Sequence, residues 1–382
     1  MGSIVTIFQY RLLHYRVDLF QLLKEKLDAD GVELRLVHGQ ASPAEAIRKD
    51  EGNLSWAIKV HNSFWTVKGR DICWQPSPND ISESDIIVIM QENRLLSNYV
   101  LLLRRILFNT PVAYWGHGAN FQSIAPRGLR EKWKRFLLTK VDWWFAYTEA
   151  TVAILLDAGF PRDKITCLNN AIDTSEFKGQ ISSVTETELL ELKKNYNLPV
   201  DAIIGLFCGS LYPEKKLELL ISAADLVHRD IPEFRLIVIG DGPSGDYLRQ
   251  EFQSRPWAIS VGIKRGREKA ALFKLSNVML NPGLVGLHVL DAFSAGLPMI
   301  TTNNALHSPE IVYLKDNVTG RLTEDNPYDY ADAVSGLLKN QDQYLRMSQA
   351  ALRAADEYTL QNMVNNFAQG VLSFLEKRKS TM

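Results

Sequence analysis

Small residues and one lysine mark a loop in the second half of the chain. The run Gly209-Ser210-Leu-Tyr-Pro-Glu-Lys215 follows an apolar stretch and ends with a cation where a helix is expected to begin. Because a cation is normally favoured at a helix C-terminus, Lys215 at the positive end indicates a negative object nearby, such as a diphosphate. From spacing alone, a surface lysine paired with Glu218 is an equally good interpretation.

Two more glycine loops follow in the same half. The turn Gly240-Asp-Gly242-Pro243 can approach a ligand closely because glycine has no Cβ. The loop Asn281-Pro-Gly283-Leu-Val285-Gly286 precedes a short predicted helix, Leu287 to Ala295. Asp291 lies far enough into that helix to reach the hydroxyls of a bound nucleotide, and a solvated helix carboxylate is the alternative.

Two histidines are candidates for polar contacts with a ligand. His117 stands between two glycines after an apolar strand, where its imidazole can project into a crevice. His307, in the segment His307-Ser-Pro-Glu310, sits near a second carboxylate. Each imidazole can serve a hydroxyl-bearing ligand or be a hydrogen-bonded structural residue, and a lone histidine slightly favours the structural interpretation.

Alternating apolar runs and helical segments must position these residues. This alternation is typical of parallel sheets covered by helices, in which ligands bind beyond the carboxyl ends of the strands. The predicted strands are 4–8, 33–37, 85–90, 112–115, 203–208, 234–239, 278–280 and 299–302, and the predicted helices are 15–27, 93–107, 215–228 and 266–275. The stretch 39–84 is predicted to be irregular, with short strands around Trp56 and Trp65.

The length of 382 residues favours two domains. We expect an acceptor-side domain at 1–185 and a nucleotide-binding domain at 195–360, joined by a polar connection from Gly179 to Leu198. A C-terminal helix at about 362–382 can pack back on the first domain. The predicted fold class is α/β, with two Rossmann-like, doubly wound domains.

Composition excludes several classes of function. The formal net charge of -1 gives no global attraction to nucleic acid, and three dispersed cysteines indicate neither a zinc site nor a disulfide scaffold. No secretory signal or apolar membrane span is visible, which favours the cytoplasm. Asp28-Ala-Asp30 looks like a helix-to-strand turn, so no metal is assigned to it, and no Walker, GxGxxG or HExxH motif supports hydrolase, nicotinamide or zinc chemistry.

The ordered motifs resemble the retaining glycosyltransferases of family 4, especially bacterial enzymes of O-antigen and surface-polysaccharide synthesis. In the first half the resemblance is carried by Tyr10–Arg16, Tyr114–Gly118 and Asn169–Asp173. In the second half it is carried by Gly209–Lys215, Val238–Pro243 and Gly286–Pro298. The resemblance implies a GT-B fold, in which the two domains face a central cleft.

The resemblance also implies roles for individual residues. Lys215 would neutralise the donor diphosphate, Asp291 would hold the ribose hydroxyls, and His117 would contact the donor sugar. The implied donor-binding set is Gly209, Ser210, Gly242, Gly262 against the base, the backbone of Gly283, Val285, Gly286 and Leu287, and Asp291.

Two departures from the family pattern concern charge. Ser210 stands where the family usually has an arginine, and Gly283 stands where it has a glutamate that touches the donor sugar. We interpret the changes as altered donor recognition, with Glu310 as a candidate for the missing carboxylate and hence for the catalytic set with His117 and Lys215.

The implied activity is hexosyl or pentosyl transfer of the EC 2.4 type, from a UDP- or GDP-sugar to an acceptor hydroxyl with retention, without metal or other cofactor. A lipid-linked saccharide is the expected acceptor. Two alternatives remain: a protein of the same fold that binds nucleotide sugar without transferring it, and a nucleotide-sugar epimerase.

A basic and aromatic segment suggests a membrane contact. Residues 127–138 mix arginines and lysines with Trp133 and Phe136, as an interfacial helix would. An ordinary amphipathic helix packed on the first domain is the equal alternative. The first alternative predicts peripheral contact with the anionic inner face of the plasma membrane.

Overall fold

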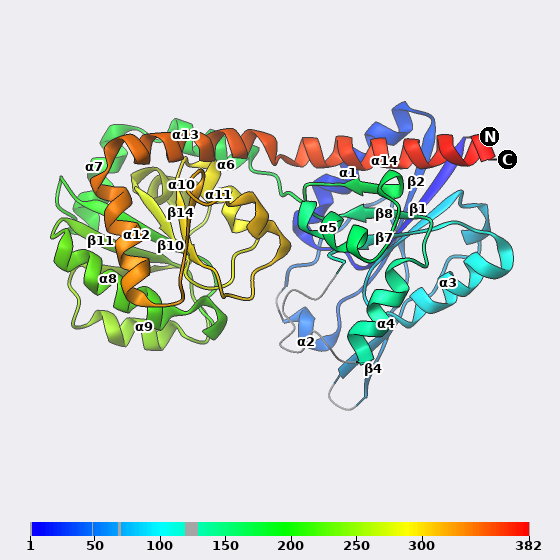
Figure 1. Cartoon of the computed structure of the whole chain (residues 1–382), viewed down its shortest axis with the longest axis horizontal. Coiled ribbons are helices and arrows are strands. Elements are labelled where there is room, and N and C mark those ends of the chain that lie inside the picture. The colour runs from blue at the N-terminus through cyan, green and yellow to red at the C-terminus, as the bar shows by residue number, and fades with distance from the viewer. Residues whose placement is uncertain (1, 48, 68–69, 119–128, 382) are drawn as a thin grey trace. The chain divides into compact units, whose positions relative to one another are not determined.

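The chain folds into two compact units. The computed structural model describes all residues except 1, 48, 68–69, 119–128 and 382. One unit comprises Met1–Asp173 together with Leu360–Met382, and the other is the continuous segment Thr174–Thr359. Both ends of the chain belong to the first unit (Figure 1).

The first unit is built on a seven-stranded parallel sheet in the order β3-β2-β1-β6-β7-β8-β9. Its strands are apolar and buried because helices cover them, which explains the near-continuous apolar runs. The strands are β1 (Ser3–Arg11), β2 (Val32–Gly39), β3 (Ile58–Lys59), β6 (Ile86–Met90), β7 (Val112–Gly116), β8 (Trp143–Ala146) and β9 (Ile165–Cys167). The helices are η1 (His14–Arg16), α1 (Val17–Ala29), α2 (Pro43–Ala46), η2 (Ile81–Glu83), α3 (Leu96–Phe108), α4 (Leu129–Leu138), α5 (Glu149–Asp157), η3 (Arg162–Lys164) and α14 (Leu360–Thr381).

The C-terminal helix α14 completes this unit by lying along α1 (Figure 1). Phe367 is fully buried, and its ring contacts those of Trp115 (5.1 Å between centroids) and Phe145 (4.4 Å). Asn366 Nδ2 donates to the carbonyl of Leu168 at 3.2 Å. The last helix of the sequence therefore belongs to the core of the first unit.

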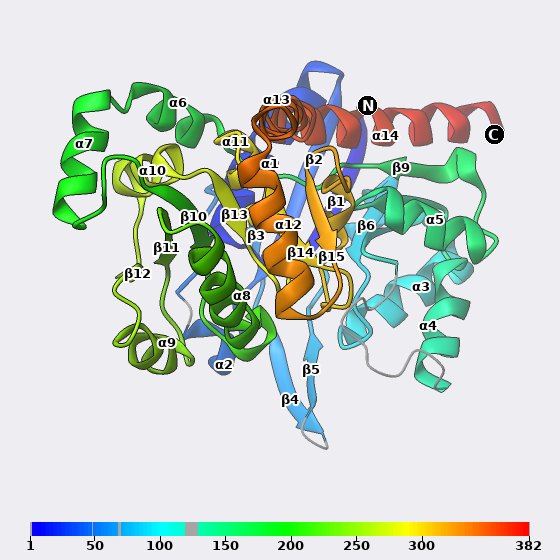
Figure 2. The same cartoon turned by 60° about the vertical axis from the view of Figure 1, so that its left-hand side comes forward.

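The second unit contains a six-stranded parallel sheet in the order β12-β11-β10-β13-β14-β15. The strands are β10 (Ile203–Cys208), β11 (Phe234–Ile239), β12 (Ala258–Gly262), β13 (Val278–Leu280), β14 (Met299–Thr302) and β15 (Gly320–Thr323). The helices are α6 (Ser175–Ser183), α7 (Glu186–Asn195), η4 (Pro213–Lys215), α8 (Leu217–Asp230), α9 (Gly245–Phe252), α10 (Gly266–Leu275), α11 (His288–Ser294), η5 (Pro309–Tyr313), α12 (Pro327–Lys339) and α13 (Gln341–Glu357). Helices α8 and α12 lie side by side (Figure 2).

The predicted fold class of two doubly wound α/β domains is confirmed, and two local expectations need correction. The stretch predicted to be irregular contains α2, β3 and the antiparallel hairpin β4 (Ser63–Val67) and β5 (Arg70–Trp74). Trp65 lies in a strand as expected, whereas Trp56 lies in a turn. The polar connection predicted at 179–198 is wrong, because α6 and α7 occupy most of it and a capping box between Thr185 and Glu188 starts α7.

Among the described residues, no helix is long and apolar enough to cross a bilayer.

Candidate functional site

The loops that follow β10, β11 and β12 are joined at one edge of the second sheet. Leu211 N–H donates to the carbonyl of Asp241 (3.0 Å), and Ser244 N–H donates back to the carbonyl of Leu211 (2.9 Å). Gly240 N–H donates to the carbonyl of Gly262 (2.9 Å). A Cβ at Gly240 would overlap with the backbone of Gly209, so this close approach requires glycine. The result is a fixed edge of backbone at the carboxyl ends of three strands.

Lys215 is buried beside this edge. Its side chain comes from η4, only 4% of the residue is exposed, and Nζ donates to the carbonyl of Leu284 at 2.6 Å. A Cβ placed on Gly209 would lie 3.9 Å from Nζ, so Gly209 leaves the ammonium approachable from one side. No carboxylate in the described part of the chain forms an ion pair with Lys215. The alternative of a surface lysine paired with Glu218 is therefore wrong.

The charge of Lys215 is only partly compensated by the protein. Burial lowers the pKa of this lysine to about 8. Tyr212 adds a weak cation–π contact, with its ring centroid 5.7 Å from Nζ. At neutral pH most molecules thus carry a buried Lys215 ammonium that donates to one carbonyl. An anion bound beside it would compensate the remaining positive charge.

Asp291 is paired with a lysine that the sequence did not single out. Lys269 Nζ lies 2.7 Å from Asp291 Oδ2, and the Asp291 side chain is 14% exposed. The alternative of a freely solvated carboxylate is therefore wrong. A ribose hydroxyl bound by Asp291 would share this carboxylate with Lys269, whose Nζ also lies over the ring of Phe177 (4.6 Å).

His288 is a further polar group that sequence reasoning missed. It is the first residue of α11, and its Nε2 is buried without a hydrogen-bond partner in the described structure. Desolvation, followed by the charges of Lys215 and Lys269, lowers its pKa well below the usual value. A neutral imidazole with an unused nitrogen therefore lies near the buried lysine.

The loop between β13 and α11 offers fewer available backbone N–H groups than expected. Leu284 N–H donates to the carbonyl of Glu214 (3.0 Å), and Val285 N–H donates to His307 Nδ1 (3.1 Å). Both are therefore used within the protein. The backbone N–H groups of Gly286 and Leu287 have no hydrogen-bond acceptor among the described residues, so no protein group competes with a ligand for them.

His307 lies between β14 and η5 and has a structural role there, because it binds the β13–α11 loop. It is 8% exposed, accepts from Val285 at Nδ1 and donates from Nε2 to the carbonyl of Thr302 (2.7 Å). Its two ring nitrogens are thus occupied, which fixes the neutral tautomer. Glu310 is 3% exposed in η5, behind the same loop.

The remaining candidates of the second unit differ in access. Ser210 is exposed, and open space surrounds the Cβ position of Gly262. Gly242 is less available than expected, because its N–H donates to Asp241 Oδ1 (2.9 Å) and a side chain at Gly242 would overlap with Leu211. Gly262 and Gly209 are thus the open glycines of the edge.

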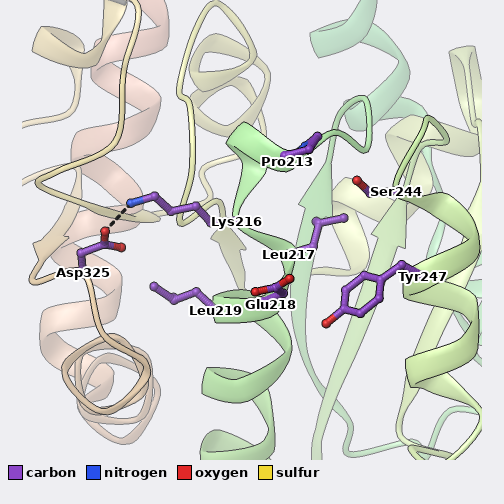
Figure 3. A pocket seen from close by; sticks show the side chains of 8 residues that line it. All are labelled: Pro213, Lys216, Leu217, Glu218, Leu219, Ser244, Tyr247 and Asp325. Atoms are coloured by element: carbon purple, nitrogen blue, oxygen red, sulfur yellow. Dashed lines mark ion pairs between the residues drawn. The ribbon is translucent and has the colours of Figure 1, made fainter. Parts of the chain in front are cut away.

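Lys216, the neighbour of Lys215 in sequence, extends toward Asp325 (Figure 3). It adopts the left-handed φ of 53° and its Nζ pairs with Asp325 Oδ2 at 2.7 Å. It lines a pocket of about 460 Å³ at the starts of α8 and α9, with Glu218 and Tyr247 also in the lining. None of the predicted donor-binding residues lines this pocket.

His117 belongs to the first unit, where it follows β7. Its ring contacts that of Tyr147 edge-on at 4.2 Å. Desolvation, with a smaller contribution from the Arg16 charge, lowers the pKa of His117. The neutral imidazole is therefore the form present at neutral pH, and it can accept a proton from a hydroxyl or donate one to it.

The predicted membrane segment is only partly described. Residues 127 and 128 lie outside the described residues, and 129–138 form α4. Trp133 and Phe136 are about half exposed and stack on each other, whereas Leu137 and Leu138 are buried. The helix thus has a packed side and an exposed aromatic side.

Comparisons with known proteins agree with this architecture. Residues 190–354, which lie within the second unit, match the family model described as Glycosyl transferases group 1. The chain is 29% identical over 208 residues to "Sulfoquinovosyl transferase SQD2" of Arabidopsis thaliana, covering 53% of this chain and 38% of that protein. It is 30% identical over 177 residues to "D-inositol 3-phosphate glycosyltransferase" of Streptomyces coelicolor, covering 42% of this chain and 38% of that protein. The matched part is thus well under half of each of these relatives.

Among solved structures, Anabaena HepE in complex with UDP superposes with a TM-score of 0.68 at 13% identity. The match covers 97% of this chain and 100% of HepE. This likeness shows the fold, and the two α/β units together match the GT-B architecture.

Proposed function

We propose that this chain is a retaining glycosyltransferase that moves a hexosyl or pentosyl group from a UDP- or GDP-sugar to an acceptor hydroxyl. The observation that carries the proposal is the buried Lys215 ammonium, which has no carboxylate partner in the described structure and lies beside an open glycine in a domain matched to group 1 glycosyltransferases. The names of both relatives support sugar transfer, and the UDP bound to HepE supports a nucleotide-sugar donor.

The chemistry follows from where charge develops. When the bond between sugar and diphosphate breaks, negative charge grows on the leaving phosphate, and a fixed cation in a desolvated site stabilises it. Lys215 supplies that cation without a metal, and the N–H groups of Gly286 and Leu287 add donors. The departing oxygen then accepts the proton of the acceptor hydroxyl, which attacks from the same face. His117 would hold the donor sugar, Asp291 the ribose, and Glu310 remains our candidate for the missing carboxylate.

Adjacent lysines allow a matched test. Lys215→Met should lower kcat about a hundredfold or more, as loss of a charge-stabilising donor does. Lys216→Met removes a neighbouring charge that pairs with Asp325 instead, so it should change kcat little. The donor is first identified with a thermal-shift panel of nucleoside diphosphates and their sugars. Wild-type kcat in Lys215→Met would overturn the proposed role.

The same purified protein and donor also distinguish between the alternative functions. Incubation with donor alone tests for an epimer, which a nucleotide-sugar epimerase would release. Tight binding of the donor without hydrolysis or transfer to any acceptor would indicate a binding protein of the same fold. Transfer with an inverted anomeric configuration, read by NMR, would contradict retention.

We further propose a lipid-linked saccharide acceptor for surface polysaccharide, met by a cytoplasmic protein at the inner face of an anionic membrane. Helix α3 exposes an apolar surface, with Ile106, Leu107 and Phe108 each more than 60% exposed. Between Leu96 and Lys140 the sequence has one acidic residue, Glu131, and eight basic residues: Arg104, Arg105, Arg127, Arg130, Lys132, Lys134, Arg135 and Lys140. Two of these are paired, Arg105 with Asp142 and Arg135 with Asp157, and positive charge still remains in excess. Apolar side chains and excess positive charge together fit an anionic lipid surface.

Vesicle binding tests this surface. The double variant Ile106→Glu/Leu107→Glu should bind phosphatidylglycerol vesicles about tenfold more weakly or worse, because it replaces apolar anchors with like charges. Leu352→Glu, at an exposed position of α13, is the matched control and should bind as wild type does. Equal co-sedimentation of all three proteins, or no loss of binding in high salt, would remove the membrane proposal.

A further inference from the structure

Arg16 is a buried cation that pairs with no carboxylate in the described part of the chain. The residue is 4% exposed and directly precedes α1. Its Nη2 donates to Asn170 Oδ1 at 2.7 Å, and its Nη1 lies 3.6 Å from Met363 Sδ. A guanidinium has five N–H donors, so one amide oxygen and one weak sulfur acceptor leave part of its capacity unused.

Aromatic rings surround this guanidinium. Its central carbon lies 5.2 Å from the ring centroid of Tyr15, 5.3 Å from that of Trp115 and 5.9 Å from that of Tyr147. Such contacts stabilise a cation and hold its plane, but they supply no negative charge. His117 contacts the same Tyr147 ring, at 4.2 Å between ring centroids, so its imidazole lies near the Arg16 guanidinium.

The position within the sheet is where this fold binds ligands. The strand order β3-β2-β1-β6-β7 reverses direction between β1 and β6. In open α/β sheets, ligands enter the crevice beyond the carboxyl ends of the strands at such a switch point. Arg16 follows β1 and His117 follows β7, so both lie at this end of the sheet.

A purely structural role explains these contacts less well. Arg16 does connect the start of α1 to Asn170 and to Met363 of α14. However, buried arginines are almost always paired, because the desolvated charge is otherwise unfavourable. The N-terminus of α1 adds further positive potential at the same place.

We propose that Arg16 binds an anionic group, a phosphate or a carboxylate, on the substrate held by the first unit beside His117. This proposal rests on the proposed function for assigning that substrate to the acceptor. A planar fork of N–H donors fits either oxyanion in a bidentate manner. The acceptor would therefore be an anionic saccharide or saccharide phosphate, with the hydroxyl to be glycosylated near His117.

The test uses the intact chain carrying Lys215→Met, so that the cation of the second unit does not compete for the probes. Calorimetric titration with glucose 6-phosphate, glucuronate and glucose separates the phosphate source, the carboxylate source and a neutral control. At least one anionic probe should bind with an affinity above that of glucose. Arg16→Gln should weaken that binding roughly tenfold or more, since it removes a charge-assisted hydrogen bond.

Arg16→Lys keeps the positive charge but lacks the planar set of guanidinium N–H donors. This variant provides the test if Arg16→Gln does not fold. It should bind the anion more weakly than the parent, yet above glucose. Equal affinity in the parent and the folded Arg16 variants, or no preference for an anionic probe over glucose, would overturn the proposal. Because Lys215 is absent throughout, the outcome does not depend on nucleotide binding or transfer, and failure of the proposed function would appear separately as absent donor turnover.

Discussion

The burial of Lys215, our proposed diphosphate contact, should lower the stability of the free protein. Its ammonium has lost most of its hydration and has gained one carbonyl acceptor, Leu284 O. We expect Lys215→Met to raise the free energy of unfolding without ligand by roughly 1 to 3 kcal/mol, because a buried charge is replaced by an apolar chain of similar size. Thermal unfolding at pH 7 measures this, and a lower melting temperature would contradict it. Lys216→Met, which loses an ion pair, should not be stabilising.

The pKa of Lys215 predicts the pH dependence of donor binding. Burial lowers it from 10.5 to about 8, so the ammonium that we propose attracts a diphosphate is lost from the free protein as pH rises through about 8. The dissociation constant for UDP should therefore increase above this pH, and Lys215→Met should show no such increase. Isothermal titration between pH 7 and pH 10 gives both profiles. A pH-independent wild-type constant would exclude Lys215 as the diphosphate contact.

Folding stability depends on pH in the opposite direction from UDP binding, because it increases as pH rises. Since the folded form binds fewer protons than the unfolded form between about pH 8 and 10.5, the wild type gains stability in that window. The stability difference from Lys215→Met is fully present below about pH 8. It should shrink toward zero as pH approaches 10.5.

Sequence reasoning found Lys215 through its unusual place at a helix start, but it could not find its neighbours. Lys269 and His288 look like ordinary helix residues, and neither the ion pair of Lys269 with Asp291 nor the buried, unused nitrogen of His288 is visible in the sequence. The N–H of Val285 was expected to be available, yet His307 uses it. Such partnerships depend on contacts between loops far apart in sequence, which spacing does not encode.

At the scale of elements, Gly283 is where two loops touch. A Cβ at this position would overlap with the backbone of Glu214 and Lys215, so the β13–α11 loop rests directly on η4. Any side chain, including the glutamate of the family pattern, would have to displace one loop. The exchange of glutamate for glycine thus coincides with a closer packing of the two loops that surround Lys215.

This contact gives a stability prediction. Gly283→Ala should destabilise the second unit by about 1 to 3 kcal/mol or more, because overlap with backbone cannot be relieved by rotating a side chain. Gly286→Ala is the matched control, since its Cβ would meet only Ser308 Oγ at an ordinary 3.5 Å. Chemical denaturation of both variants measures the difference. Equal stability would show that the loops separate easily.

Helices and strands could be predicted from the sequence where the burial of apolar side chains determines their position. The strands Ile203–Cys208, Phe234–Ile239 and Val278–Leu280 match the expected ranges because they are apolar runs within a covered sheet. A short strand around Trp65 was expected, but its pairing with β5 was missed because Trp65 and Val67 remain exposed, so cross-strand pairing rather than a core face organises the hairpin. Helices α6 and α7 were missed because their serines, threonines and glutamates resemble a linker.

At the scale of the whole molecule, the first unit is discontinuous in sequence. Phe367 of α14 fills the space between Trp115 and Phe145. Phe367→Ala should therefore destabilise the first unit by about 3 to 5 kcal/mol while leaving the UDP binding that we propose for the second unit nearly unchanged. Hydrogen exchange resolved along the chain measures the two units separately. Gln369→Ala, at an exposed position of the same helix, is the control, and equal loss of protection in both units would contradict the prediction.

The return of α14 also has a consequence for biosynthesis. A nascent chain emerging from the ribosome can complete residues 174–359 as one continuous unit, whereas the earlier unit must wait for residues 360–382. Until then, Trp115 and Phe145 lack the aromatic ring that covers them. A premature stop codon before α14 would thus yield a chain with an intact second unit and an incomplete first unit. The exposed apolar surface of that first unit would be bound by chaperones and attacked by quality-control proteases.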